Sequence, residues 1–321
     1  MPLAEFDLIR EYFSNSTASR DDVILGVGDD CALLQTPAGM DMAITTDTLV
    51  EGVHFSPGTD PEALGHKSLA VNLSDLAAMG AQPSWVTLAL TMPTSDPDWL
   101  KGFSCGFLAL AQKHHVALIG GDTTSGPLSI TITAHGFVEP DKAIRRSGAK
   151  VGDQIYITGS LGDAGLALLA RQGGYAPGED LSQLEQRLDL PQPRLAVGQA
   201  LSGIATAAID ISDGLISDLG HICEGSGVGA KVYLDRIPTS GQVKRYLQQG
   251  GDWGTVVAAG DDYELCFTVP SVQEPLLETV STNLDCDLTL VGEMVAGSGV
   301  TCIQSDGTVV TELTSGYQHF T

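Results

Sequence analysis

Basic side chains are scarce in this chain of 321 residues. Lysine and arginine number 16 against 40 aspartates and glutamates, which gives a formal net charge of −24 at pH 7. Binding to nucleic acid or to anionic membrane surfaces depends on clustered lysine and arginine. No basic run is longer than a pair such as Arg145–Arg146. The composition therefore predicts neither a nucleic-acid partner nor a membrane partner.

Long apolar runs are also missing. No stretch of about 18 apolar residues occurs, and the first residues show no basic region followed by an apolar core. We therefore expect a soluble, unexported, cytoplasmic protein. The 6 cysteines form no close pairs, so we expect small buried side chains rather than a zinc or redox motif. With 43% hydrophobic residues, the chain can build a large core, and its length favours two domains.

The common nucleotide and hydrolase motifs are absent as well. The sequence contains no G-x-x-x-x-G-K-[ST] loop, no G-x-G-x-x-G opening a helix, and no H-R-D with D-F-G. It also lacks a G-x-S-x-G elbow and an H-E-x-x-H pair. These absences exclude the usual P-loop, Rossmann and protein-kinase interpretations, and they leave serine-hydrolase and zinc-protease interpretations without support.

Apolar periodicity predicts strands and helices in both halves of the chain. The expected strands span 31–35, 42–50, 85–92, 117–119, 128–138, 154–158, 207–209, 231–234, 264–269 and 288–291. The expected helices span 61–79, 97–115, 161–172, 194–202, 213–224 and 272–283, with another around Phe6, Ile9 and Phe13. Such alternation indicates α/β or α+β architecture. A shift in composition over residues 139–150 predicts a domain boundary near residue 148, with domains 1–148 and 149–321.

Acidic residues gather at strand ends and beside glycines in five segments. These are Gly26–Asp30, Thr45–Asp47, Asn72–Asp75, Gly120–Asp122 and Asp210–Gly214. One such segment alone is typical of a turn or a helix cap. Five together indicate a hard dication, because carboxylates held close repel one another unless a cation neutralises them. The EF-hand spacing is absent, so we expect several Mg²⁺ ions that share their coordination with nucleotide phosphates.

These segments resemble the thiamine-monophosphate kinase family, in the superfamily of aminoimidazole-ribonucleotide synthetase and selenophosphate synthetase. The resemblance covers nearly the whole chain. The five acidic segments fit the superfamily, and Arg146–Ala149 adds to the match. Val50–Phe55 together with Asp262–Leu265 indicates this kinase in particular.

The resemblance implies transfer of the γ-phosphoryl group of ATP to thiamine monophosphate, which yields thiamine diphosphate. It implies a two-domain aminoimidazole-ribonucleotide synthetase-like α/β (α+β) fold. In that fold an N-terminal ATP- and Mg²⁺-binding domain pairs its sheet across a homodimer, and a larger C-terminal α/β domain follows. The Mg²⁺ ligands that it implies are Asp30, Thr45, Thr46, Asp47, Asp75, Asp122, Asp210 and Asp213. The ATP contacts would be Gly121, Asp122, Arg146 and Ser212, and the thiamine monophosphate contacts would be His54, Asp261 and Tyr317.

The acidic composition suits this reaction. The nucleophile is a phosphate oxygen that is already ionised at neutral pH, so no general base is expected. Mg²⁺ would bring two polyanions together, and Arg146 would add a planar cationic contact. One departure concerns Asp261, where the family commonly has glutamate. The carboxylate on the substrate side therefore sits on a stem one methylene shorter.

Two alternatives remain at this point. Another ATP-dependent enzyme of the superfamily would fit the glycine–aspartate segments. A selenophosphate synthetase would require a reactive cysteine, for which Cys31 is the only candidate, and its apolar neighbours favour a buried strand instead. The second alternative is a divalent-cation-binding protein without turnover. In that case His54 and Arg146 would be ordinary surface residues, and Asp210 and Ser212 would cap a helix.

Overall fold

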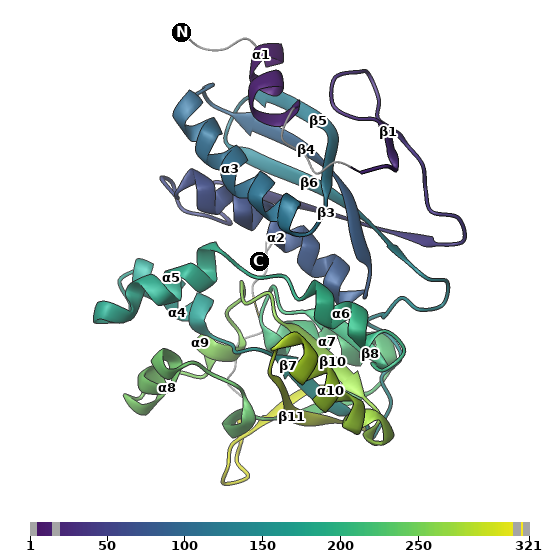
Figure 1. Ribbon diagram of the computed structural model, residues 1–321. Coiled ribbons are helices and arrows are strands. Elements are labelled where there is room, and N and C mark those ends of the chain that lie inside the picture. Colours follow the sequence, from purple (N-terminus) through teal and green to yellow (C-terminus); the bar gives the residue numbers. More distant parts are fainter. Residues whose placement is uncertain (1–4, 15–19, 311–315, 317–321) are drawn as a thin grey trace. The chain divides into compact units, whose positions relative to one another are not determined.

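The computed structural model describes residues 5–14, 20–310 and 316 (Figure 1). Contacts divide the chain into two compact units. The first comprises Met1–Leu76 and Ala81–Asp141, and the second comprises Ala77–Gly80 and Lys142–Thr321. Within the described residues, no helix is both long and apolar enough to cross a membrane.

The first unit is built on a four-stranded sheet of order β3-β6-β4-β5. Its strands are β3 (Asp41–Val50), β4 (Gln82–Met92), β5 (Ala117–Ser125) and β6 (Ser129–Val138). Neighbours are antiparallel except β4 and β5, which run parallel and are joined through helix α3 (Pro97–Lys113). Helices α2 (Pro61–Ala78) and α3 cover one face of the sheet (Figure 1).

Helices α2 and α3 approach each other closely because glycines line their contact. A Cβ atom on Gly106 of α3 would lie 1.8 Å from the carbonyl oxygen of Glu62 in α2. A Cβ atom on Gly65 of α2 would lie 2.0 Å from the carbonyl oxygen of Phe103 in α3. Helix α3 begins after Asp96, whose side chain accepts hydrogen bonds from the next free backbone N–H groups, as its Asp-Pro start predicted.

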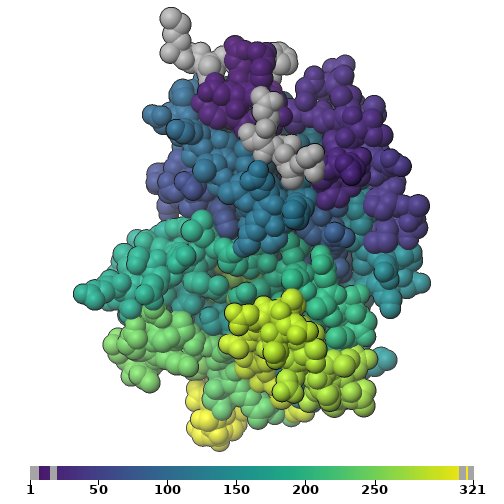
Figure 2. Space-filling model, viewed as in Figure 1, coloured from purple at the N-terminus to yellow at the C-terminus, as the bar shows by residue number. Residues whose placement is uncertain are grey.

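The N-terminal segment of this unit contains α1 (Glu5–Ile9), a π-helical turn η1 (Arg10–Ser14), and the short strands β1 (Val23–Leu25) and β2 (Leu33–Leu34). Val23 and Leu34 pack against Trp85 and Phe137 on the sheet. The opposite side of this two-stranded ribbon leaves Ile24 66% exposed. Figure 2 shows this purple segment on the surface.

Among its described residues, the second unit contains a seven-stranded sheet of order β13-β12-β9-β11-β7-β10-β8, in which only the β12–β9 pairing is parallel. Its strands are β7 (Gln154–Thr158), β8 (Ala207–Asp210), β9 (Gly229–Tyr233), β10 (Leu265–Val269), β11 (Leu288–Val295), β12 (Gly299–Ile303) and β13 (Val309–Val310). Its helices are α4 (Asp163–Arg171), α5 (Leu181–Asp189), α6 (Leu195–Leu201), α7 (Leu215–Ser226), α8 (Gly241–Gln248), α9 (Gly254–Val257) and α10 (Glu274–Leu284). Short 3-10 turns η2 (Gly178–Asp180), η3 (Leu234–Arg236) and η4 (Ser271–Gln273) complete it.

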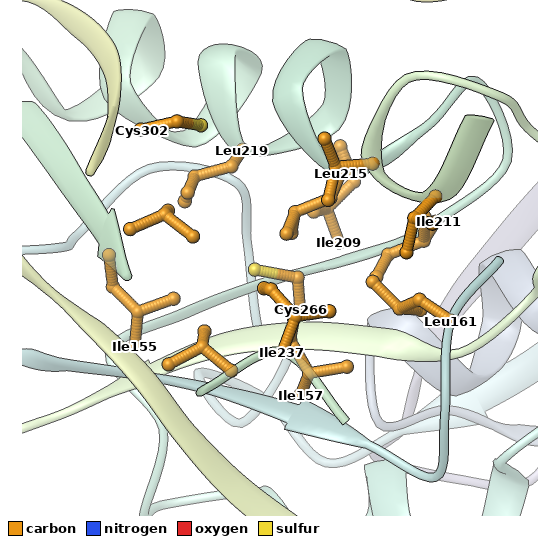
Figure 3. Close-up of a cluster of buried hydrophobic side chains, with 14 of the residues drawn as sticks. Ile155, Ile157, Leu161, Ile209, Ile211, Leu215, Leu219, Ile237, Cys266 and Cys302 are labelled. Carbon is orange, nitrogen blue, oxygen red and sulfur yellow. The ribbon is translucent and has the colours of Figure 1, made fainter. Parts of the chain in front are cut away.

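The main core of the second unit combines side chains of the sheet and of α7 with side chains of α4, α5, α8 and α9. Figure 3 shows Ile157, Ile209 and Cys266 of neighbouring strands in one cluster with Leu215 and Leu219 of α7. Each of these side chains is at most 2% exposed. At roughly 25 cal/mol per Å² of apolar surface removed from water, such burial is the main stabilising contribution to the unit. This core holds the ends of β8 and β10 in place.

The expected mixed α/β (α+β) architecture is confirmed, and the differences are local. Gly120–Asp122 lies inside β5 rather than in a turn after a short strand, because the parallel partner β4 extends the ladder to Ser125. The predicted strand at 31–35 shrinks to Leu33–Leu34. Cys31 is exposed, so its predicted burial is wrong, and the same holds for Cys105. The other cysteines are buried and free, as expected.

Candidate functional site

Two polar residues of β3 and two of α2 meet in the first unit. The Thr45 hydroxyl donates a hydrogen bond to Asp75 Oδ2. The backbone N–H of Asp47 donates to Asn72 Oδ1 at 3.2 Å, and the side-chain amide of Asn72 donates to the carbonyl of Ser68 at 3.2 Å. Ser68, Asn72 and Asp75 therefore form the polar face of α2 that their three- and four-residue spacing predicts.

Asp47 is electrostatically strained in this position. Burial and, second, the negative charge of Asp75 raise the pKa of Asp47 to about 7. Two half-buried carboxylates beside a hydroxyl form a set of hard oxygen donors, and a divalent cation would neutralise their repulsion. Within the described part of the chain, no three His, Cys, Asp or Glu side chains gather as a preformed metal cage. The donor set thus fits Mg²⁺, which takes one or two protein carboxylates and fills its shell with water and phosphate.

The other predicted metal ligands of this unit do not join that group through their side chains. Thr46 points to the opposite face of the sheet, where its Oγ1 lies 2.9 Å from Thr133 Oγ1. Asp30 is exposed, and its N–H donates to Asp29 Oδ1 at 2.8 Å. Asp122 is exposed on β5, in register with Ala89 of β4.

Gly121 is required by the backbone of β5. Its φ is +152°, and a Cβ atom there would lie 1.8 Å from the carbonyl oxygen of Leu88. The close approach of β4 therefore requires a glycine at this position, immediately before Asp122.

His54 closes the turn that follows β3. Its Nδ1 accepts a hydrogen bond from the N–H of Val50 at 3.0 Å. In the neutral ring the proton therefore resides on Nε2, which leaves that nitrogen as a donor. The side chain is half-buried, so it is not an ordinary exposed surface histidine.

In the second unit, three of the predicted residues lie at the end of β8 and directly after it. Asp210 is the last residue of β8, is 3% exposed and stands in register with Leu265. Ser212 and Asp213 follow, and both donate their backbone N–H groups to Asp218 Oδ2, at 3.0 and 3.1 Å. This acidic loop, Asp210–Gly214, is thus tied to the first turn of α7.

Asp218 is a residue that sequence reasoning missed. It is 2% exposed. Burial and the charge of Asp213 raise its pKa to about 7, while the two backbone donors and the positive charge of Arg146 act in the opposite direction. Asp218, Asp213 and Arg146 are therefore close enough to interact. The sequence did offer a signal, because Asp218 is an acid near the start of a predicted helix, five residues after Asp213 of the acidic loop.

The segment carrying Arg146 is fastened to the end of α7. The N–H groups of Gly148 and Ala149 each donate to Ser226 Oγ at 3.1 Å, and the N–H of Ala208 donates to the carbonyl of Arg145 at 3.0 Å. Gly148 has a φ of +130°. Arg146 is exposed, so its guanidinium is available to an anion.

The segment from Gly260 to Glu264 runs beside the acidic loop and extends the pairing of β8 with β10. The N–H of Asp261 donates to the carbonyl of Ser212 at 2.9 Å, and the N–H of Tyr263 donates to the carbonyl of Ile211 at 2.8 Å. A Cβ atom on Gly260 would lie 2.0 Å from the carbonyl oxygen of Ser212. The segment Gly260–Glu264 and the acidic loop are therefore held together within the second unit.

Two acids of this segment point into the protein. Asp262 is 6% exposed and accepts the N–H of Gly162 at 3.0 Å, and burial raises the pKa of Asp262 well above its ordinary value. Glu264 is 1% exposed. It accepts from Arg187 Nη2 at 2.7 Å, from Arg194 Nε at 2.6 Å and from the Thr158 hydroxyl at 2.6 Å. Asp262 and Glu264 therefore fix this segment to the interior of the second unit.

Asp261 differs from its neighbours because its side chain is half-buried rather than enclosed. The Tyr263 hydroxyl donates a hydrogen bond to Asp261 Oδ1 at 3.2 Å. Tyr317, the remaining predicted substrate contact, lies outside the described residues. At Gly316 the chain runs against the acidic loop, since a Cβ atom there would lie 2.5 Å from the carbonyl oxygen of Asp213.

Both units match family models. Residues 28–138 match the family described as "AIR synthase related protein, N-terminal domain", and residues 150–304 match "AIR synthase related protein, C-terminal domain". Together the two models cover most of the chain.

Full-length relatives and solved structures agree with these models. The thiamine-monophosphate kinase of Salmonella typhimurium is 49% identical over 322 residues, covering 100% of this chain and 99% of the relative. The crystal structure of thiamine-monophosphate kinase from Stenotrophomonas maltophilia superimposes with a TM-score of 0.87 at 46% identity, over 97% of this chain and 99% of that one. AaThiL complexed with AMPPCP and TMP superimposes with a TM-score of 0.77 at 31% identity, over 92% of each chain.

Proposed function

We infer the function from the premise that this chain belongs to the thiamine-monophosphate kinase family, within the AIR synthase related proteins. It is a kinase. We propose that it phosphorylates thiamine monophosphate with ATP, in a Mg²⁺-dependent direct in-line transfer, to give thiamine diphosphate and ADP. The complex of AaThiL with AMPPCP, an ATP analogue, and TMP supports both substrates.

The observation that carries the Mg²⁺ dependence is the pairing of Asp47 with Asp75. Their mutual repulsion and the burial of Asp47 disfavour the charged carboxylates unless a cation is bound. The proposed ligands in the first unit are Asp30, Thr45, Thr46, Asp47, Asp75 and Asp122, where Thr46 would contribute through its backbone because its side chain points to the opposite face of the sheet. Those in the second unit are Asp210 and Asp213. When bound, Mg²⁺ neutralises phosphate charge and aligns the attacking and leaving oxygens.

The residues of the chain would bind and orient the two substrates. In this proposal Gly121 and Asp122 contact the nucleotide, and Arg146 and Ser212 hold its phosphates. His54, Asp261 and Tyr317 contact thiamine monophosphate. The attacking phosphate oxygen is already ionised, so none of these residues removes a proton from it.

We propose that residues 1–148 form the ATP- and Mg²⁺-binding domain and residues 149–321 the C-terminal domain. In this proposal, the enzyme acts in the cytoplasm as a homodimer whose N-terminal sheets pair. Exposed Ile44 (59%) and Met42 (41%) on the edge strand β3 support such an interface.

One experiment tests the proposed reaction. Purified protein is incubated with ATP, Mg²⁺ and thiamine monophosphate, and the thiamine species are separated by chromatography. We expect thiamine diphosphate with Mg²⁺, none with EDTA, and none from the Asp47→Asn variant at matched folding. If the folded protein binds Mg·ATP and yields no thiamine diphosphate, the proposed reaction is wrong, and another phosphoryl transfer of the superfamily takes its place.

A further inference from the structure

Tyr263 adopts a backbone conformation that large side chains rarely occupy. Its φ is +49°, and that of Asp261, two residues earlier, is +69°. A bulky residue in the left-handed region is strained and persists only where its surroundings enforce it. Two such residues within three positions indicate a segment that the rest of the fold holds in a costly shape.

The surroundings that enforce this shape are the buried anchors on either side of Tyr263. Asp262 is bound to the N–H of Gly162, and Glu264 is bound by Arg187 and Arg194. The N–H of Tyr263 itself donates to the carbonyl of Ile211. Because these contacts fix the backbone, the directions of the side chains at 261 and 263 are fixed as well.

The Tyr263 side chain carries this constraint to Asp261. The tyrosine is 8% exposed, so its ring is held by packing. Its hydroxyl reaches back to Asp261 Oδ1 at 3.2 Å. This hydrogen bond restricts the rotation of the Asp261 carboxylate, which is short and only half-buried.

We propose that Tyr263 is a positioning residue for the acceptor substrate: its hydroxyl holds the Asp261 carboxylate in the orientation that contacts thiamine monophosphate. This inference rests on the proposed function, in which Asp261 contacts that substrate. Because Asp261 is one methylene shorter than the glutamate common in the family, the fixed orientation determines whether its oxygens reach the ligand. Tyr263 acts through Asp261 and does not touch the reacting phosphates.

The Tyr263→Phe variant tests the proposal, since it removes one hydroxyl and keeps the buried ring. We expect the KM for thiamine monophosphate to rise roughly three- to tenfold, as the loss of one such hydrogen bond predicts. The KM for ATP and kcat should stay within about twofold. The matched control is Tyr246→Phe, whose hydroxyl bonds Thr255 Oγ1 at 3.0 Å and the N–H of Asp252 at 3.1 Å in the same unit. Its kinetics should match the wild type.

A double-mutant cycle separates positioning from a merely structural role. Asp261→Gly removes the carboxylate, and glycine accepts a φ of +69° without strain. In the Asp261→Gly background, Tyr263→Phe should leave the KM for thiamine monophosphate unchanged, because its effect passes through Asp261. This comparison holds even if Tyr263→Phe lowers the melting temperature, which is followed in parallel.

The outcomes distinguish this inference from the proposed function. If the wild type forms no thiamine diphosphate, the proposed function is wrong and the positioning role is wrong with it. If the wild type is active and Tyr263→Phe has an unchanged KM for thiamine monophosphate, only the positioning role is wrong. An equal increase in KM with and without Asp261 also overturns it.

Discussion

The negative charge of Asp75 adds to burial in raising the pKa of Asp47 to about 7. The two carboxylates lie on different elements, β3 and α2. Without a bound cation, an ionised Asp47 is unfavourable next to Asp75. The metal-free protein is therefore less stable than it would be without a charge at position 47.

The first prediction concerns pH and the stability of the metal-free protein. The pKa of Asp47 rises from 3.8 when unfolded to about 7 when folded, so the folded state binds the proton more tightly. The unfolding free energy of the metal-free protein should therefore fall as pH rises from 4 to 7. In EDTA at pH 7.5, Asp47→Asn should be more stable than the wild type by about 1–2 kcal/mol, after allowance for solvent screening. Urea unfolding at pH 4 and pH 7.5 measures this.

Added Mg²⁺ provides the companion measurement for Asp47. Under the proposed Mg²⁺ dependence the ion binds the folded state, and it should therefore raise the melting temperature of the wild type. It should raise that of Asp47→Asn much less, although that variant starts higher. A variant that loses stability in EDTA would contradict the repulsion described for this pair.

The second prediction concerns the ion pairs of Glu264. Glu264→Gln removes the charge that two arginines share, at a carboxylate that is 1% exposed. We expect a loss of about 3 kcal/mol, because breaking a buried pair leaves charge uncompensated. Glu185→Gln is the control, since Glu185 pairs with Arg171 at 3.1 Å and its side chain is 33% exposed. That loss should stay below about 1 kcal/mol in the same urea titrations.

The third prediction concerns the glycine contact between α2 and α3. Gly106→Ala should destabilise the protein by about 2 kcal/mol or more, because its Cβ would overlap the backbone carbonyl of Glu62. Gly220→Ala in α7 has open space for the same atom and should be neutral or stabilising by up to about 1 kcal/mol. The melting temperatures of the two variants then compare the effect of the same added methyl group at a crowded and at an open helix position. Equal melting temperatures would contradict the close approach.

The fourth prediction concerns Asp218. Asp218→Ala removes the acceptor that holds the N–H groups of Ser212 and Asp213. We expect kcat/KM for ATP to fall at least tenfold, since the acidic loop would lose its orientation. Asp218→Asn keeps one carbonyl acceptor and should retain more activity than the alanine variant. Steady-state kinetics at saturating thiamine monophosphate give the comparison, and the reverse order of the two variants would count against this role.

Local signals predicted most of the architecture. The alternation in residues 128–138 identified a strand with one covered face, and the Asp96–Pro97 pair located the start of α3. The spacing of Ser68, Asn72 and Asp75 predicted a shared helical face. These features depend on neighbours within one element, which the sequence presents directly.

Features that depend on distant partners were harder to predict. Gly120–Asp122 is a strand only because β4 pairs with it, and no local pattern indicates that pairing. Likewise, the arginine partners of Glu264 are 77 and 70 residues away in sequence. Two features that the sequence analysis left out did have a local signal. The opposite directions of Thr45 and Thr46 follow from strand alternation, and the leucine spacing of α5 is that of an amphipathic helix.

The inward anchoring of Asp262 and Glu264 has an evolutionary consequence for their neighbour. Four polar partners hold these two acids, so changes there compromise folding before they alter chemistry. Asp261 lies between Gly260 and Asp262, and its side chain is half-buried rather than enclosed. Under the substrate role proposed for Asp261, a lineage can therefore exchange this acid for a longer or shorter one and sample new acceptor preferences while the scaffold stays intact. Position 261 is a natural place to begin a redesign of acceptor selectivity.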